Sequence, residues 1–271
     1  MNQISNQKPF ENFFLALHKP WEKDKRKLLF PIEDSEKEKN SMLLKRFIGE
    51  RADLQNFRFD SDQIKGICQR QKLNALDLLG ESWRVGKPLI KSPQWRLIVG
   101  IGGGSIYETA ILLHHIYGIP YIPGTALKGV THHHALNQEF DQIKIDEIFG
   151  QDELPEESIN GSQGRIIFFD AFPIESPTIE PDVMTPHYPD YYGKTKPKPP
   201  ADWQSPNPIG FLTVGHQTKF QFILGIKRKF GTEDEIDKAL LTLALAWLEE
   251  ALQFRGIGAK TAVGYGYMQK Q

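Results

Sequence analysis

The order in which strand-type and helix-type apolar patterns follow one another is the feature that most constrains the fold of this chain. Runs rich in β-branched and aromatic residues, such as GRIIFFDAF and KFQFILGIK, alternate with segments whose apolar residues recur at helical spacing. We interpret 95–102, 164–172, 219–227 and 261–268 as strands, and 125–138, 140–150 and 235–254 as helices. This order, with a long insertion between the two middle strands, predicts an α+β, ferredoxin-like (βαββαβ) domain.

Short local signals mark the ends of the predicted helices. Thr125 is expected to cap the first helix, which Gly129 weakens. The second helix is expected to end on Gly150. Thr232 and Glu235 have the spacing of a capping box in front of the third helix.

The rest of the chain predicts an extension and an insertion. Residues 1–92 are rich in charged and amide side chains with apolar residues at helical intervals, which predicts a helical N-terminal extension before a domain at 93–271. Residues 173–215 are rich in proline and have little periodicity. A compact domain rarely holds so long an irregular segment unless that segment projects and acts, so we expect a functional insertion there.

Charge and cysteine usage limit the classes of function. Lys and Arg number 33 and Asp and Glu number 34, so the chain lacks the basic excess of an independent nucleic-acid-binding protein. A local basic groove, or a partner that supplies charge, remains compatible with this balance. The single cysteine, Cys68, fits a reducing compartment, and neither a signal peptide nor a membrane-spanning apolar run is visible, so we expect a cytoplasmic protein.

The glycine-rich tail, QFRGIGAKTAVGYGYMQKQ, looks at first like a phosphate-binding P-loop. A P-loop has glycine before its lysine, a strand that enters and a helix that leaves, whereas here Ala259 precedes Lys260 and a helix enters. We therefore reject nucleotide binding by this loop. Gly256 and Gly258 are instead expected to present amides to an anion, with Arg255 and Lys260 beside them. The alternative is a glycine-rich turn or bulge that serves packing alone.

Three segments together resemble one family: IPYIPGTALKGV, GRIIFFDAF and GIGAKTAVGYGYM. The chain resembles the RAMP superfamily, the RNA-binding subunits of CRISPR effector complexes. The segments RLIVGIGGGSIYETAILL and DVMTPHYPDYYG narrow the resemblance to the Cmr, or type III-B, branch. This implies a non-catalytic subunit that binds crRNA near the guide 3′ end, contributes to target RNA recognition, and contacts the backbone and capping RAMP subunits.

The resemblance also implies which residues meet RNA. Where the first helix begins, its N-terminus and free amides would face the RNA backbone, with Lys128 as the first cation; without the motif, a solvated helix lysine is the better interpretation. The insertion at 173–215 corresponds to the family's thumb, which wedges between bases; the alternative is a loop packed on its own surface. The implied RNA-binding residues are Gly124, Thr125, Lys128, Gly129, Arg255, Gly256, Gly258, Lys260 and Thr261, and those of the thumb are Met184, Pro186, His187 and Tyr188.

Catalysis is the weaker interpretation. Glu108 falls near the place where a backbone RAMP subunit carries a cleaving aspartate, but it is one methylene longer and in a different local sequence. The runs His114–His115 and His132–His134 suggest a metal site or acid–base RNA cleavage, yet consecutive helical residues point about 100° apart and do not converge. Asp170 is expected to orient a loop or to accept an N–H. We expect no cofactor and no metal.

Overall fold

The computed structural model describes residues 59–79, 83–103, 109–151, 163–188, 191, 199–201, 206, 208–228 and 233–269. The chain divides into two compact units, the larger of which comprises Asp60–Val99, Pro120–Thr178 and Val214–Gln271. The smaller unit includes Gly100–Ile119 and Ile179–Thr213. Glu108, Thr232 and most of the predicted N-terminal extension lie outside the described residues.

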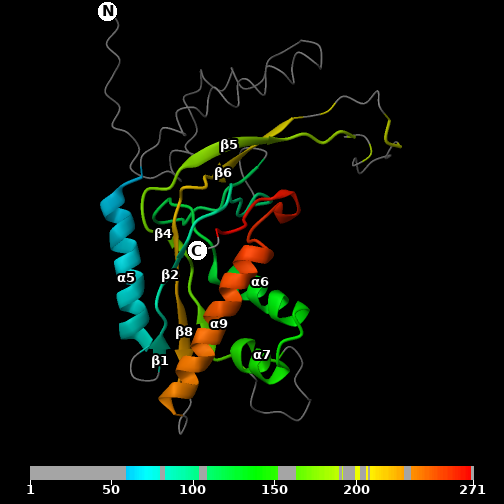
Figure 1. Cartoon of the computed structure of the whole chain (residues 1–271). Helices are drawn as coiled ribbons and strands as arrows, with labels where there is room; N and C mark the ends of the chain where they lie inside the picture. The colour runs from blue at the N-terminus through cyan, green and yellow to red at the C-terminus, as the bar shows by residue number, and fades with distance from the viewer. Residues whose placement is uncertain are drawn as a thin grey trace, which may run out of the picture. The chain divides into compact units, whose positions relative to one another are not determined.

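The larger unit is built on antiparallel strands that share one middle run of chain (Figure 1). This run is apolar at almost every position, because it is buried on both faces: Phe220, Phe222, Leu224 and Ile226 have no exposed surface. The run consists of β7 (Phe220–Phe222) and β8 (Leu224–Lys227). β8 pairs with β1 (Trp83–Val85) on one side and with β3 (Ile166–Phe168) on the other. β7 pairs with β2 (Leu89–Lys91) on one side and with β4 (Phe172–Pro173) on the other.

The register aligns the strands on both sides of the middle run. Ile226 lies opposite Arg84 on one side and Ile166 on the other. Isolated bridges extend the pairing, from Pro93 to Met268 and from Ile122 to Ala171. Read across the strands, chain segments far apart in the sequence therefore lie in the order 268, 93, 220–227 and 166–173.

Among the described residues of the larger unit, four helices flank these strands. Figure 1 shows α5 (Ser61–Leu79) on one side of the strands, and α6 (Gly124–Asn137), α7 (Gln142–Phe149) and α9 (Asp234–Phe254) on the other. Stacked aromatic rings connect α9 to α7 and to the link between α6 and α7. The Trp247 ring of α9 lies 4.8 Å from Phe140 in that link and 6.4 Å from Phe149 of α7, measured between ring centroids. The amphipathic pattern of α9 buries Leu240, Ala244, Leu248 and Leu252 against the core.

The smaller unit contains a two-stranded sheet of β5 (Ile179–Met184) and β6 (Ile209–Val214). The Thr213 hydroxyl donates a hydrogen bond to the Glu180 carbonyl at 2.8 Å. The chain turns at Tyr117 and Gly118, since the Gly118 amide donates to the His114 carbonyl and Gly118 has a φ of 65°. These two strands occupy the ends of the predicted insertion, so the segment we expected to be irregular has regular pairing at its base.

The observed helices and strands correct several boundaries. β1 and β2 lie inside residues 1–92, so that range is not wholly helical, and the sheet starts before residue 93. Segment 95–102 forms a bridge from Leu97 to Val214 rather than a full strand. The predicted closing strand at 261–268 is a 3₁₀ turn (η2, Thr261–Val263) followed by the Met268 bridge. Glycines at positive φ bend the chain there and prevent extended pairing.

Two helix caps also differ from those predicted. α6 begins at Gly124 with Pro123 as its N-cap, so Thr125 lies inside the first turn and caps nothing. α9 begins at Asp234 with Glu233 as its N-cap, and the Glu233 side chain makes no cap hydrogen bond; Thr232, on which the predicted capping box depends, lies outside the described residues. Acidic residues in its first turn favour the helix dipole instead. α7 ends on Gly150 as predicted, and the Asp141 carboxylate caps its start by accepting from Ile143.

Among the described residues, no helix is both long and apolar enough to cross a membrane.

Candidate nucleic-acid interface

The N-terminus of α6 already holds an anion, which comes from the protein itself. The Asp170 carboxylate, from the turn between β3 and β4, accepts a hydrogen bond from the Gly124 amide at 2.7 Å. The Ala126 and Leu127 amides both donate to the Pro123 carbonyl. The expectation that several free amides of this helix face RNA is therefore wrong, because a carboxylate takes the place of a phosphate. The expected role of Asp170 as an N–H acceptor is confirmed.

Asp170 is itself held in position by its neighbours. The Gln71 side chain of α5 donates to the Asp170 carbonyl, which connects α5 to the turn before α6. Burial, and the negative charge of Asp170, raise the pKa of Tyr121. No local pattern could have predicted this cap, because Asp170 and Gly124 are 46 residues apart in the sequence.

The two glycines of α6 have opposite environments. A Cβ atom on Gly124 would lie 2.0 Å from the Phe168 carbonyl oxygen, so glycine is required for the helix to pack against β3. A Cβ atom on Gly129 would meet nothing within 4 Å. Gly129 is exposed and interior to the helix, where glycine costs about 1 kcal/mol relative to alanine without any packing reason. The backbone of α6 is therefore not covered by side chains at Gly129.

Thr125 and Lys128 accompany Gly129 on that face. Thr125 is exposed and stands one helical turn from Gly129, while Lys128 is half-buried beside them. Together these residues present a hydroxyl, a cation and bare backbone to the surroundings. We call Thr125, Lys128 and Gly129 the α6 patch.

Most of the tail amides are used inside the protein. Ile257 donates to Gly266, Ala259 to Ile98, and Gly266 to Arg96. The glycines are required for this packing, since a Cβ atom on Gly258 would lie 2.1 Å from the Ile98 oxygen at a φ of +91°. The Gly256 amide is not available to an anion, because it donates to the Ala251 carbonyl, and the backbone that approaches Gly258 closely is the chain's own Ile98.

A different backbone conformation follows a few residues further on. Lys260 adopts a left-handed conformation, with φ 59° and ψ 31°, and the 3₁₀ turn of Thr261–Val263 follows it directly. A left-handed residue followed by a right-handed one turns successive amides towards a common point, which is the geometry of an anion-binding nest. Within the part of the chain that the structure describes, the Thr261 and Ala262 amides donate no hydrogen bond. We call Lys260, Thr261 and Ala262 the tail nest.

The side chains around the tail nest are accessible. Lys260, Thr261 and Arg255 are half-buried, and Ala262 and Gly264 are exposed. Of the predicted tail residues, the structure thus places Lys260 and Thr261 in the nest, whereas Gly256 and Gly258 shape the loop that carries it. The glycines of the tail indicated an irregular loop in the sequence, but they did not indicate the nest itself, because its left-handed residue is a lysine and not a glycine.

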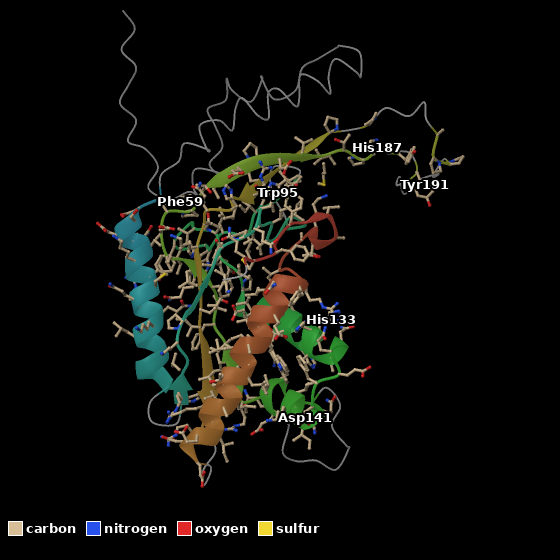
Figure 2. The ribbon with its side chains drawn as sticks, in the orientation of Figure 1. Phe59, Trp95, His133, Asp141, His187 and Tyr191 are labelled. Carbon is tan, nitrogen blue, oxygen red and sulfur yellow. The ribbon has the colours of Figure 1, made fainter. Side chains whose placement is uncertain are left out.

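The predicted thumb residues follow the end of β5 in the smaller unit. Met184 is the last residue of β5, and Pro186, His187 and Tyr188 continue from it. The rings of His187 and Tyr188 are 6.4 Å apart and tilted by 55°, and His187 is exposed (Figure 2). Planar and apolar side chains therefore follow directly on the end of β5.

The histidine runs do not form a shared site. The His132 ring packs 4.7 Å from Phe149, His133 is exposed and contacts Asn137, and His134 is buried with its Nε2 3.3 Å from Glu250. The three side chains thus meet different partners, as the helical geometry predicts. In the smaller unit, His114 stacks on His115 and on Tyr117. Among the described residues, no three His, Cys, Asp or Glu side chains are grouped as metal ligands.

Antiparallel strands with α5 on one side and α6, α7 and α9 on the other, followed by a glycine-rich tail, define a protein of mixed helix and strand content. A profile of the RAMP superfamily matches residues 83–269, so the chain belongs to the RAMP superfamily. This confirms the resemblance found in the sequence, and the match begins at β1.

Relatives within this superfamily narrow the assignment. A Pyrococcus furiosus protein named CRISPR system Cmr subunit Cmr6 is 35% identical over 228 residues, which cover 64% of this chain and 64% of that protein. A Saccharolobus solfataricus protein named CRISPR system CMR subunit Cmr6 is 26% identical over 254 residues, covering 91% of this chain and 76% of that protein. The matched region thus spans less than two thirds of the Pyrococcus relative.

A solved structure shares the fold. A chain in the structure described as the type III-B Cmr-beta complex bound to cognate target RNA superimposes with a TM-score of 0.64 at 22% identity, covering 91% of this chain and 79% of that chain.

Proposed function

We propose that this chain is a crRNA-binding structural subunit of a type III-B (Cmr) CRISPR effector complex, acting in antiviral defence. It binds the guide near its 3′ end, contributes to target RNA recognition, and contacts backbone and capping RAMP subunits. Support comes from membership of the RAMP superfamily and from two relatives named as the sixth Cmr subunit. The cytoplasm is its compartment, where Cys68 stays a thiol.

The observation that carries this proposal is the tail nest. Two amides without an internal acceptor, beside Lys260, suit the recognition of one phosphate of a polynucleotide. Contacts of this kind hold the sugar–phosphate backbone whatever the base sequence, as a guide with variable sequence requires. They also need few cations, which reconciles RNA binding with a net charge of −1.

The α6 patch supplies a second backbone contact in this proposal. The exposed Gly129 lets an RNA backbone approach the helix closely, and Lys128 and the Thr125 hydroxyl lie on the same face. With the N-terminal amide of α6 taken by Asp170, the RNA runs across the side of the helix and not onto its end.

The finer fold that we propose is ferredoxin-like. The strand segments lie in the order 268, 93, 220–227 and 166–173, which corresponds to fourth, first, third and second in a βαββαβ chain with α6 and α9 as its two helices. The domain in this proposal starts at β1 and not at residue 93. The β5–β6 hairpin is the base of the thumb, and Met184, Pro186, His187 and Tyr188 wedge against bases.

We also propose that the subunit does not cut RNA. His134 is buried and His132 packs on Phe149, so neither is placed as an acid–base pair with its neighbours. Incubation of the purified chain with guide-repeat RNA and with target RNA tests this point. Cleavage that disappears in a Glu108→Gln or a His133→Ala variant would establish the endoribonuclease alternative instead.

The decisive experiment measures RNA affinity against salt concentration. Lys260→Gln in the tail nest and Lys128→Gln in the α6 patch are each expected to weaken binding and to reduce the slope of log K against log [salt] by about 0.7, the value for one phosphate contact on a single strand. Lys72→Gln, an exposed lysine of α5, is the matched control and is expected to change neither quantity. Equal affinities and slopes for all three variants would refute the proposed interface.

A further inference from the structure

Trp95 is an exposed aromatic residue that the core does not explain. Although tryptophan is the side chain with the most apolar surface to bury, 45% of Trp95 is exposed. Trp247, by contrast, is 5% exposed in the aromatic stack between α9 and α7. A partly exposed tryptophan that packing does not require is typical of a binding site.

The backbone on either side of Trp95 is fixed by pairing. The Gln94 amide donates to the Tyr267 carbonyl at 2.7 Å, and the Leu97 amide donates to the Val214 carbonyl at 2.9 Å. The Arg96 carbonyl accepts from the Gly266 amide at 2.8 Å. Because its neighbours are tied on both sides, the indole is presented to the surroundings in a defined position at little cost in conformational entropy.

The ring contacts of Trp95 connect it to the tail nest. The indole lies 4.6 Å from the ring of Tyr265, which is itself buried, and the Tyr265 amide bonds the carbonyl of Lys260 at 3.4 Å. The Arg96 guanidinium lies 5.3 Å from the indole ring. One short stretch of surface therefore combines a phosphate-type nest, an open aromatic ring and a cation that stacks on aromatic planes.

We propose that Trp95, supported by Tyr265 and accompanied by Arg96, is a stacking platform for one unpaired nucleobase of the RNA whose phosphate occupies the tail nest. This inference rests on the proposed function and adds the base contact that the backbone contacts lack. Stacking on an indole tolerates every base, because each base has a π-face. The platform thus positions a nucleotide without selecting its identity, which suits a guide of variable sequence.

Binding of a short labelled single-stranded RNA to the full chain tests the platform. Trp95→Ala is expected to weaken binding by roughly 5- to 150-fold, the range for loss of one stacked base, and Trp95→Phe is expected to recover most of that loss. With a matched abasic oligonucleotide the Trp95→Ala effect is expected to vanish. The salt slope is expected to stay unchanged, because no charge is lost. Phe254→Ala, at the last residue of α9 with a side chain 61% exposed, is the control and is expected to leave affinity unchanged.

Photocrosslinking gives a second readout that does not depend on a variant. RNA carrying 5-iodouridine is expected to crosslink to the tryptic peptide 92–96 of the wild-type chain, whose one aromatic residue is Trp95. If the wild-type chain binds RNA but Trp95→Ala binds equally well and peptide 92–96 stays unlabelled, the platform is refuted while the proposed function stands. If the wild-type chain binds no RNA, both the platform and the proposed function are refuted. If Trp95→Ala instead prevents assembly with sibling subunits in the absence of RNA, the residue is a protein contact and the platform is refuted.

Discussion

Alanine substitution at the two glycines of α6 is expected to have effects of opposite sign. Gly129→Ala adds a methyl group where nothing lies within 4 Å, so the helix gains about 0.5–1 kcal/mol from the lower backbone entropy of the unfolded chain. Gly124→Ala places its methyl group 2.0 Å from the Phe168 oxygen, and α6 must move away from β3. Such overpacking costs about 1–3 kcal/mol, and displacement of the Asp170 hydrogen bond costs about 1 kcal/mol more.

Urea unfolding followed by circular dichroism measures both changes in free energy. Each kilocalorie corresponds to roughly 2–4 °C in the midpoint of thermal unfolding for a domain of this size, so the two variants should melt on opposite sides of the wild type. RNA binding provides the second half of the test, because the same methyl group at Gly129 obstructs close approach of an RNA backbone. Gly129→Ala is therefore expected to be more stable and to bind RNA less tightly.

Two outcomes would refute this reasoning. If Gly124→Ala folds with unchanged stability, the contact with the Phe168 carbonyl does not constrain the helix as the structure indicates. If Gly129→Ala binds RNA with wild-type affinity, the open backbone of α6 does not meet RNA, and the α6 patch loses its main support. A concentration series at fixed salt is needed for the second measurement, since affinity for RNA depends steeply on salt.

Three further predictions follow from contacts in the larger unit. The Arg165 guanidinium ties α7 to α9 through Glu147 and the buried Asp237. Burial lowers the pKa of Arg165, but the hydrogen bonds and charges of Asp237 and Glu147 together outweigh burial and hold that pKa above its ordinary value. Asp237→Asn is therefore expected to lower the free energy of unfolding by about 3–5 kcal/mol in urea titrations, whereas a change below about 1 kcal/mol would contradict the buried pair. Burial raises the pKa of the Cys68 thiol, so alkylation of the folded chain should reach half its maximal rate at a higher pH than alkylation of the chain unfolded in urea. Because the unfolded thiol ionises first, the free energy of unfolding should fall as pH rises above about 8.5. Coincident profiles of alkylation rate against pH for the folded and unfolded chain would contradict this prediction. Asp170→Ala, which removes the acceptor of the Gly124 amide, should cost about 0.5–2 kcal/mol, and Asp170→Asn should restore most of it because its side-chain oxygen still accepts.

The long, strongly periodic elements were predictable from sequence because local chemistry decides them. The pattern from Asp234 to Phe254 has apolar residues on one face over more than five turns, and the part of KFQFILGIK between its two lysines is apolar at almost every position because it is the middle strand. β1 and β2 were missed, since each has three residues and their extended conformation comes from pairing with a strand more than a hundred residues later. A three-residue strand carries too little periodicity to be recognised alone.

The sequence indicated two places for the candidate site, but it could not supply the hydrogen bonds made there. The sequence pointed to the start of α6 and to the tail, and both carry exposed backbone. Which amides are open depends on tertiary contacts: Asp170 takes the Gly124 amide, and Ile98 takes the Ala259 amide. The left-handed Lys260 could not be foreseen from composition, because non-glycine residues rarely adopt that conformation.

The position of the middle strand has a consequence for how the chain is made. Both of its neighbours, near residues 83–91 and 166–173, leave the ribosome long before residues 220–227, so neither can pair until most of the chain has been synthesised. Formation of this sheet requires closure of large loops, which slows the search for the native arrangement. Until then the early apolar segments stay exposed in the nascent protein, and chaperone occupancy during translation should be highest in the interval before residue 227 emerges.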